Sequence, residues 1–156
     1  MLAWKCKRCN TTDTSLRYPS GKMNKCMDCQ RWYNVSVNSK KPRKRKPSPE
    51  LLMSETEFLE WCKEQPRSCS YCGIQEKSVR NIGMKTQAGH KLAALGIDRV
   101  DPERGYEKDN IVFCCFACNK AKGDVFSHEE MMVIGKSIAL AWESRLQRSN
   151  KILIKE

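Results

Sequence analysis

The chain has 156 residues, which is enough for one compact domain with an extension but not for two large domains. Its formal net charge of +11 lies entirely in the N-terminal third: residues 1–47 hold 13 Lys or Arg and 2 Asp or Glu, whereas residues 48–156 hold 16 of each. A basic segment of this kind favours a polyanionic binding partner such as nucleic acid. A solvated basic tail with no partner would have the same composition.

The first ten residues, "MLAWKCKRCN", carry charge and cysteine where a secretory signal has an apolar run. The longest apolar run, "IVFCCFAC", is far too short to span a bilayer. We therefore expect an intracellular protein, cytoplasmic in a bacterial or phage setting; in a eukaryotic or viral setting, the nucleus is the alternative. In a reducing compartment, ten cysteines indicate metal binding rather than a disulfide framework.

Residues 1–38 are predicted to form a zinc module. Two C-x-x-C pairs, Cys6/Cys9 and Cys26/Cys29, are separated by 16 residues, which fits one tetrahedral four-cysteine site. The segment "QRWYNVSVN" that follows is expected to continue as a short helix or strand, with Trp32 and Tyr33 packed on the module.

A second zinc site is predicted from two further pairs, Cys69/Cys72 and Cys115/Cys118, which lie 42 residues apart. Cys114 could compete for that metal, but only Cys115 makes a C-x-x-C pair with Cys118. Cys62 is read as a small buried apolar residue. A redox role for one of the pairs is an open alternative.

Residues 39–50, "SKKPRKRKPSPE", have the composition of a basic linker. This composition is consistent with three roles: a segment that follows a phosphate backbone, a nuclear-import signal, or a solvated tether. The linker residues that we predict to bind DNA are Lys41, Arg43, Lys44, Arg45 and Lys46.

Residues 51–156 are predicted to form the main domain. A capping box of Ser54 and Glu57 opens a helix that Pro66 stops, with Phe58, Leu59, Trp61 and Cys62 on its apolar side. Residues 67–94 are a weakly patterned loop after the zinc turn. "ALGID" and "DNIVFC" are predicted strands joined by a hairpin connection, in which Tyr106 packs. "CFACNKAKGD" is a short helix ended by Gly123.

The last helix is predicted from a second capping box, Ser127 with Glu130. An apolar stripe recurs there at helical spacing and is more typical of a core than of an interface: Met131, Ile134, Ile138, Trp142 and Leu146.

These blocks carry a resemblance to a known family. Residues 69–142, with "LGIDRVD", "GYEKDNIVFCC" and "CFACNKAKGD", resemble the HNH (ββα-metal, His-Me finger) endonucleases, and most of all their small, two-zinc, rare-cutting restriction enzymes. The resemblance implies an α+β fold: a small zinc-stabilised ββα-metal nuclease core with an N-terminal four-cysteine module and flanking helices.

The resemblance also implies the site. Asp98 and Asn119 would hold one divalent ion, and their oxygen ligands suit Mg²⁺ or Mn²⁺ rather than a third zinc. Asn110 would brace the loop before the second strand. Arg99 stands where the family usually has its histidine base; since a guanidinium stays protonated, Arg99 is predicted to grip the phosphate instead.

The base is predicted to be His90, because imidazole titrates near neutrality and two-zinc relatives have an ionisable tyrosine at that position. His90 precedes Asp98 by eight residues, roughly 26 Å in one straight strand, so the chain must turn within residues 91–96. A surface or structural role is the alternative. His128 is read as structural or exposed. Lys120 and Lys122 are predicted phosphate contacts.

The leading function is a sequence-specific endonuclease of double-stranded DNA, of type II restriction or homing type, leaving 5′-phosphate and 3′-hydroxyl ends. One site cuts one strand, so a homodimer is expected. The cofactors would be two structural Zn²⁺ per chain and one catalytic Mg²⁺ or Mn²⁺ per site. The alternatives are a monomeric nicking or repair nuclease, and a decayed zinc protein that only binds DNA.

Overall fold

The computed structural model describes residues 4–18, 24–42 and 46–153, and the side chains of that last segment as far as residue 148. Two compact units are present: Met1–Gln65 with Glu103–Ile111, and Pro66–Pro102 with Val112–Glu156. The predicted borders at residues 38 and 51 do not coincide with these units, because the helix after Ser54 belongs to the first one. The functional division into module, linker and nuclease domain stays a prediction.

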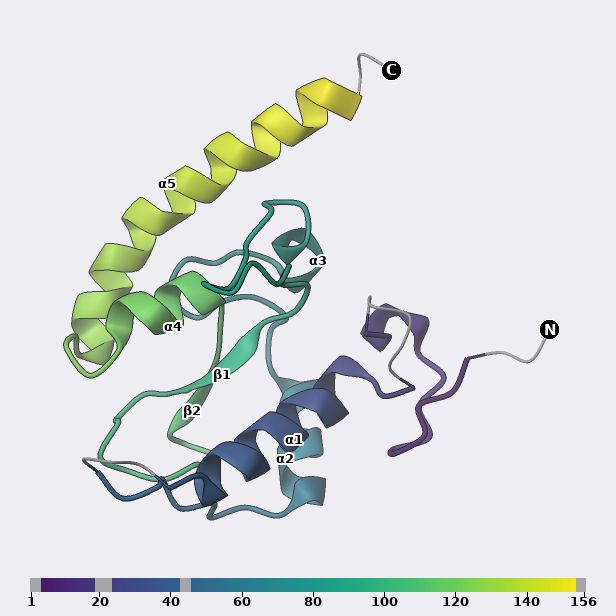
Figure 1. The fold of residues 1–156 in the computed structure, drawn as a ribbon, viewed down its shortest axis with the longest axis vertical. Helices are drawn as coiled ribbons and strands as arrows, with labels where there is room; N and C mark the ends of the chain where they lie inside the picture. The colour runs from purple at the N-terminus through teal and green to yellow at the C-terminus, as the bar shows by residue number, and fades with distance from the viewer. Residues whose placement is uncertain (1–3, 19–23, 43–45, 154–156) are drawn as a thin grey trace. The chain divides into compact units, whose positions relative to one another are not determined.

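The first unit contains the 3-10 turn η1 (Thr14–Leu16) and two helices packed on each other, α1 (Met27–Lys40) and α2 (Glu55–Glu64). Figure 1 shows α1 and α2 side by side. An aromatic pair joins them, with the Phe58 ring centroid 5.5 Å from that of Trp32 on α1. Within α2, the Phe58 centroid lies 5.9 Å from that of Trp61. Tyr33 is 46% exposed, with Lys25 Nζ 4.9 Å from its ring centroid, whereas the neighbouring Trp32 is buried.

The predicted capping box of α2 is confirmed, since Ser54 Oγ accepts from Glu57 N and the Glu57 carboxylate accepts from Ser54 N. Phe58, Trp61 and Cys62 are buried as expected. The loop of residues 103–111 also belongs to this unit. Tyr106 is buried there. Its backbone N donates a hydrogen bond to Glu50 O at 2.8 Å, and its carbonyl accepts one from Leu52 N at 3.0 Å.

The second unit contains a strand–strand–helix arrangement. The strands β1 (Gly96–Arg99) and β2 (Ile111–Cys114) form a two-stranded sheet, and α4 (Phe116–Lys122) follows β2 directly. Both strands and this helix were predicted. The short helix α3 (Glu76–Val79) was not. Gly123 ends α4 with φ +48°, and its N–H donates to Asn119 O.

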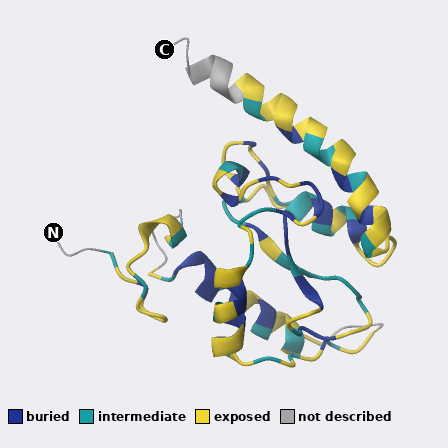
Figure 2. Ribbon diagram, turned by 180° about the vertical axis from the view of Figure 1, so that it is seen from behind, coloured by how far each residue is buried: buried dark blue, intermediate teal, exposed yellow. Residues whose placement is uncertain are grey.

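The last helix, α5 (His128–Leu153), packs on α4 near its start. Its predicted capping box is confirmed by hydrogen bonds from Ser127 N to Glu130 and from Glu130 N to Ser127 Oγ. Met131 and Trp142 on the predicted stripe are buried. Figure 2 shows mostly exposed residues along the outer side of α5. Within the described part of the chain, no helix is both long and apolar enough to cross a membrane.

Candidate functional site

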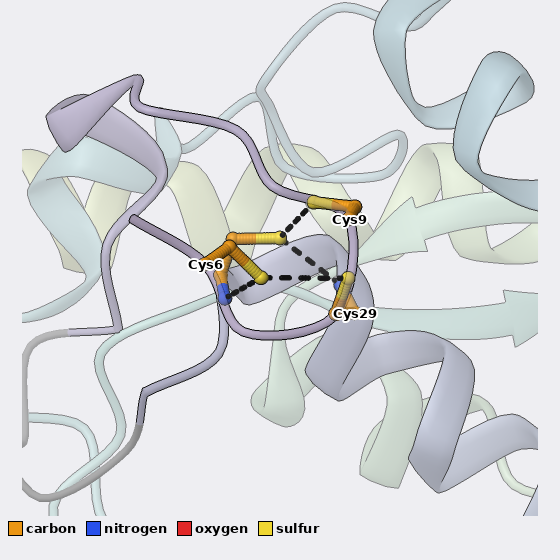
Figure 3. A group of neighbouring side chains, drawn as sticks. Cys6, Cys9 and Cys29 are labelled. Carbon is orange, nitrogen blue, oxygen red and sulfur yellow. Dashed lines mark hydrogen bonds between the residues drawn. The ribbon is translucent and has the colours of Figure 1, made fainter. Parts of the chain in front are cut away.

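Four sulfur atoms converge in the first unit. Cys6 and Cys9 lie in the loop before η1, whereas Cys26 is the N-cap of α1 and Cys29 lies in its first turn. The Sγ atoms of Cys6 and Cys29 are 3.8 Å apart, and those of Cys9 and Cys26 are 3.6 Å apart. Figure 3 shows Cys6, Cys9 and Cys29 pointing toward one another.

A second group has the same design. Cys69 and Cys72 form a turn before α3, Cys115 is the N-cap of α4, and Cys118 lies inside that helix. All four are buried, and the Cys72 and Cys115 Sγ atoms are 3.7 Å apart. The preference for Cys115 is confirmed; the Cys114 thiol instead donates to Cys115 O at 3.3 Å.

Both groups fit a tetrahedral zinc ion. A zinc–sulfur bond of about 2.3 Å in tetrahedral geometry places its sulfur atoms about 3.8 Å apart, which matches the three distances above. Backbone N–H groups support the sulfurs: Cys29 N donates to Cys26 Sγ, and Cys118 N to Cys115 Sγ, each at 3.4 Å. Burial also raises the pKa of the Cys26 thiol to about 11.

Asp98 lies on β1, and its carboxylate is held through a single oxygen. The Tyr71 hydroxyl donates to Asp98 Oδ2 at 2.7 Å, and Lys122 Nζ lies 3.0 Å from the same atom. Burial and the neighbouring carboxylate raise the pKa of Tyr71 above its usual range, so the phenol keeps its proton and acts as donor. Among the described residues, Asp98 Oδ1 accepts no hydrogen bond.

Asn119 lies on α4 against the same strand. Its Nδ2 donates to Ile97 O at 3.4 Å, which brings this amide beside the residue that precedes Asp98. With Nδ2 used in this way, the amide Oδ1 is left without a donor in the part of the chain that the structure describes. Two oxygens on adjacent elements are thus available, and this donor set fits a hard divalent cation such as Mg²⁺ or Mn²⁺.

Arg99, the residue after Asp98, ends β1. Its Nη1 donates to Pro102 O at 2.6 Å, which holds the guanidinium at the turn that leaves the strand. A guanidinium carries five N–H donors, of which this hydrogen bond uses one.

Asn110 lies in the first unit, immediately before β2, and is fully buried. Its Nδ2 donates to Gly105 O at 2.9 Å and its backbone N donates to Glu107 O, so its amide braces the loop of residues 103–111. The role in the site that the resemblance implies for Asn110 stays a prediction.

His90 is exposed on a hairpin of residues 84–92. Its backbone N donates to Thr86 Oγ1 at 3.1 Å, its carbonyl accepts from Thr86 N, and Gly89 adopts φ +80° in the turn between them. The chain therefore reverses within residues 86–89, before His90, and this reversal is not the turn within residues 91–96 that was expected between His90 and Asp98. Among the described residues, no hydrogen bond joins His90 to Asp98, and its role as base stays a prediction.

The predicted DNA contacts divide into three groups. Lys41, Lys46 and Lys120 are exposed, although Lys46 also pairs with Glu103 at 3.2 Å. Lys122 points inward with 1% exposure, which differs from the phosphate contact expected of it. Arg43, Lys44 and Arg45 lie outside the described residues.

Tyr71 is the functional candidate that the sequence did not single out. It lies between two zinc-site cysteines, where it reads as part of a turn, and 27 positions separate it from Asp98. Its only sequence signal is a large amphipathic side chain inside a C-x-x-C turn. Its backbone carbonyl also lies so close to Gly135 on α5 that a Cβ at that position would clash with it.

No family model and no curated protein sequence matches the chain. Two strands followed by a helix, with a carboxylate on the first strand and an asparagine on the helix, form the ββα unit of HNH nucleases, and the chain belongs to the HNH endonuclease family. The similarity that shows this is to the solved structure of the rare-cutting HNH restriction endonuclease PacI. The two chains are 31% identical with a TM-score of 0.79, over 90% of this chain and 96% of that one.

Proposed function

We propose that the protein is a sequence-specific endonuclease of double-stranded DNA that hydrolyses phosphodiester bonds and leaves 5′-phosphate and 3′-hydroxyl ends. The observation that carries this proposal is the pair of oxygens without donors, Asp98 Oδ1 and Asn119 Oδ1, on the ββα unit of an HNH protein. The neighbour's description as a DNA-perturbing restriction endonuclease supports DNA as the substrate.

Asp98 and Asn119 are the residues that would hold one Mg²⁺ or Mn²⁺ ion. Such an ion supplies charge stabilisation for the phosphate and the leaving 3′-oxygen when it is bound. The protein's own groups do the rest in this proposal. Arg99 grips a non-bridging phosphate oxygen, and Asn110 keeps the loop before β2 in place. Lys41, Lys46 and Lys120 contact the phosphate backbone.

We assign the two four-cysteine groups to structural zinc. Closed thiolate sites of this geometry leave no open position for substrate, so they stabilise the fold rather than react. The two kinds of site therefore select different metals: the soft sulfur ligands bind zinc, and the hard oxygen ligands bind Mg²⁺.

We further propose that the active form is a homodimer, because one site of this kind cuts one strand and a palindrome needs two. Val133 and Leu140, which are seven residues apart on α5, are each 67% exposed and offer an apolar face to a second copy. A monomeric nicking or repair nuclease is the competing form. Supercoiled plasmid separates the two, since a dimer gives linear product in one encounter and a monomer accumulates nicked circles.

His90 is the proposed general base. Replacing it with glutamine is expected to reduce the single-turnover cleavage rate by about 10²–10⁴-fold, because a general base contributes about that much, while DNA affinity stays unchanged. The matched control is Gln87→Ala on the same hairpin, which should cut like the wild type. Wild-type cleavage by His90→Gln would refute the assignment.

The function itself is tested by incubating a panel of plasmids with the protein in the presence and absence of Mg²⁺. We expect Mg²⁺-dependent linear products of discrete lengths. A protein that binds these plasmids but never cuts them with Mg²⁺ or Mn²⁺ is the decayed DNA-binding protein, and that result overturns the proposal.

A further inference from the structure

Lys122 on α4 is a buried cation with an unusually complete set of partners. Its side chain is 1% exposed, and its ammonium donates to the backbone carbonyls of Arg99 and Val100, the latter at 3.0 Å. Its third partner is Asp98 Oδ2, also at 3.0 Å. A buried ammonium is costly unless all of its donors are satisfied, so this arrangement fixes the end of β1 relative to α4.

The same carboxylate oxygen has a second donor. Tyr71, 4% exposed, donates its hydroxyl to Asp98 Oδ2 at 2.7 Å from within the zinc turn. Two further contacts hold this residue in place: the His128 ring centroid lies 5.4 Å from the Tyr71 ring centroid, and Gly135 packs on the Tyr71 backbone. Two donors from different elements therefore converge on one oxygen.

We propose that Lys122 and Tyr71 are positioning residues that hold Asp98 by Oδ2 and so present Oδ1 to the divalent cation. The inference rests on the proposed function and extends it to two residues that do not themselves bind the cation or the phosphate. A carboxylate with one oxygen held by hydrogen-bond donors is fixed in orientation, and its second oxygen remains able to bind a cation. An unanchored aspartate on a four-residue strand would sample several rotamers.

The zinc turn takes part in this arrangement. Tyr71 lies between Cys69 and Cys72, so the second four-cysteine group positions the donor that orients Asp98. Lys122 lies four residues after Cys118 on α4, a helix that begins at the same group. The zinc site therefore sets both anchors of the carboxylate.

The test uses the full-length zinc-loaded protein and the variants Lys122→Met and Tyr71→Phe. Mn²⁺ binding is measured by the loss of the free-ion electron paramagnetic resonance signal, with the protein alone and with a random-sequence duplex. Zinc content and melting temperature are recorded for each variant. Lys136→Met, which removes an exposed lysine on α5, is the matched control and should bind Mn²⁺ like the wild type.

The expected result is a loss of Mn²⁺ affinity of about 10- to 100-fold in both variants, at unchanged zinc content and duplex affinity, with cleavage restored in part by raising Mn²⁺. Tyr71→Phe removes one hydroxyl and decides the matter if Lys122→Met fails to fold. Wild-type Mn²⁺ affinity in folded Tyr71→Phe overturns the inference. If the wild type itself binds no Mn²⁺, the proposed function fails, and that outcome is distinct.

Discussion

Asp98→Asn is expected to cut DNA at least about a thousandfold more slowly than the wild type while binding DNA with similar affinity. The asparagine keeps an oxygen that can accept from Tyr71 and Lys122, so the fold around β1 is preserved. It loses the negative charge that would hold the divalent cation, and removing charge stabilisation of a developing oxyanion costs about that factor. Single-turnover cleavage and a binding isotherm in Ca²⁺ measure the two effects separately.

The alanine variant at Asp98 should fail in a second way. Without the carboxylate, the Lys122 ammonium keeps only two backbone carbonyls as partners in a nearly water-free position. Breaking a buried ion pair from one side costs about 3–5 kcal/mol, so Asp98→Ala should also lower the melting temperature. Glu143→Ala, an exposed carboxylate on α5, is the control for charge removal. Unchanged cleavage in Asp98→Asn would contradict the site as described.

Removing zinc is expected to unfold the protein rather than simply inhibit it. Structural zinc contributes about 10–16 kcal/mol to folding in small zinc modules, whereas the stability of a whole domain is about 5–15 kcal/mol. In the second unit, the four-cysteine group joins the turn of residues 69–72 to the start of α4, so its loss disconnects the elements that carry Tyr71, Asn119 and Lys122. Cys118→Ser should therefore lose both ordered helix and one zinc equivalent.

The readouts are far-ultraviolet circular dichroism and zinc release measured together during titration with a strong chelator. Cys62→Ala is the matched control, because Cys62 is buried on α2 but lies outside both four-cysteine groups. This variant should retain two zinc ions per chain. Full helical signal after complete zinc removal would contradict a structural role for the metal.

Local patterns carried the sequence predictions that the structure confirms. The C-x-x-C pairs, both capping boxes and Gly123 depend on interactions within a few residues, and each was predicted from its spacing alone. The two strands were predicted from short apolar runs on either side of a hairpin connection. The second zinc group spans 42 intervening residues, yet its two halves are themselves local motifs.

What could not be predicted depends on contacts between distant residues. A lysine on a short helix is normally solvated, and nothing in "CFACNKAKGD" distinguishes inward Lys122 from exposed Lys120. Tyr71 meets Asp98 only because the zinc turn and β1 pack together. The helix α3 escaped prediction because it has four residues, yet it places Glu76, whose carboxylate accepts from Leu95 N at 2.9 Å, just before β1.

Residues 84–92 show the same limit. The segment lacks clear periodicity, and its hairpin is defined by backbone hydrogen bonds together with a glycine at positive φ. The turn in this hairpin depends on a Thr86 side chain that accepts the His90 backbone N–H, and it lies before His90 rather than between His90 and Asp98, where the base assignment needs one. Hydrogen bonds from a backbone N–H to a side chain leave only a weak signal in the sequence.

Cleavage of a random-sequence DNA library, followed by sequencing of the ends, tests the central claim most directly. The account predicts that the wild-type protein with Mg²⁺ produces ends at one recurrent palindromic site, with 5′-phosphates, and that Asp98→Asn produces none. A library left intact by the wild type in both Mg²⁺ and Mn²⁺, or cut equally well by Asp98→Asn, would contradict it.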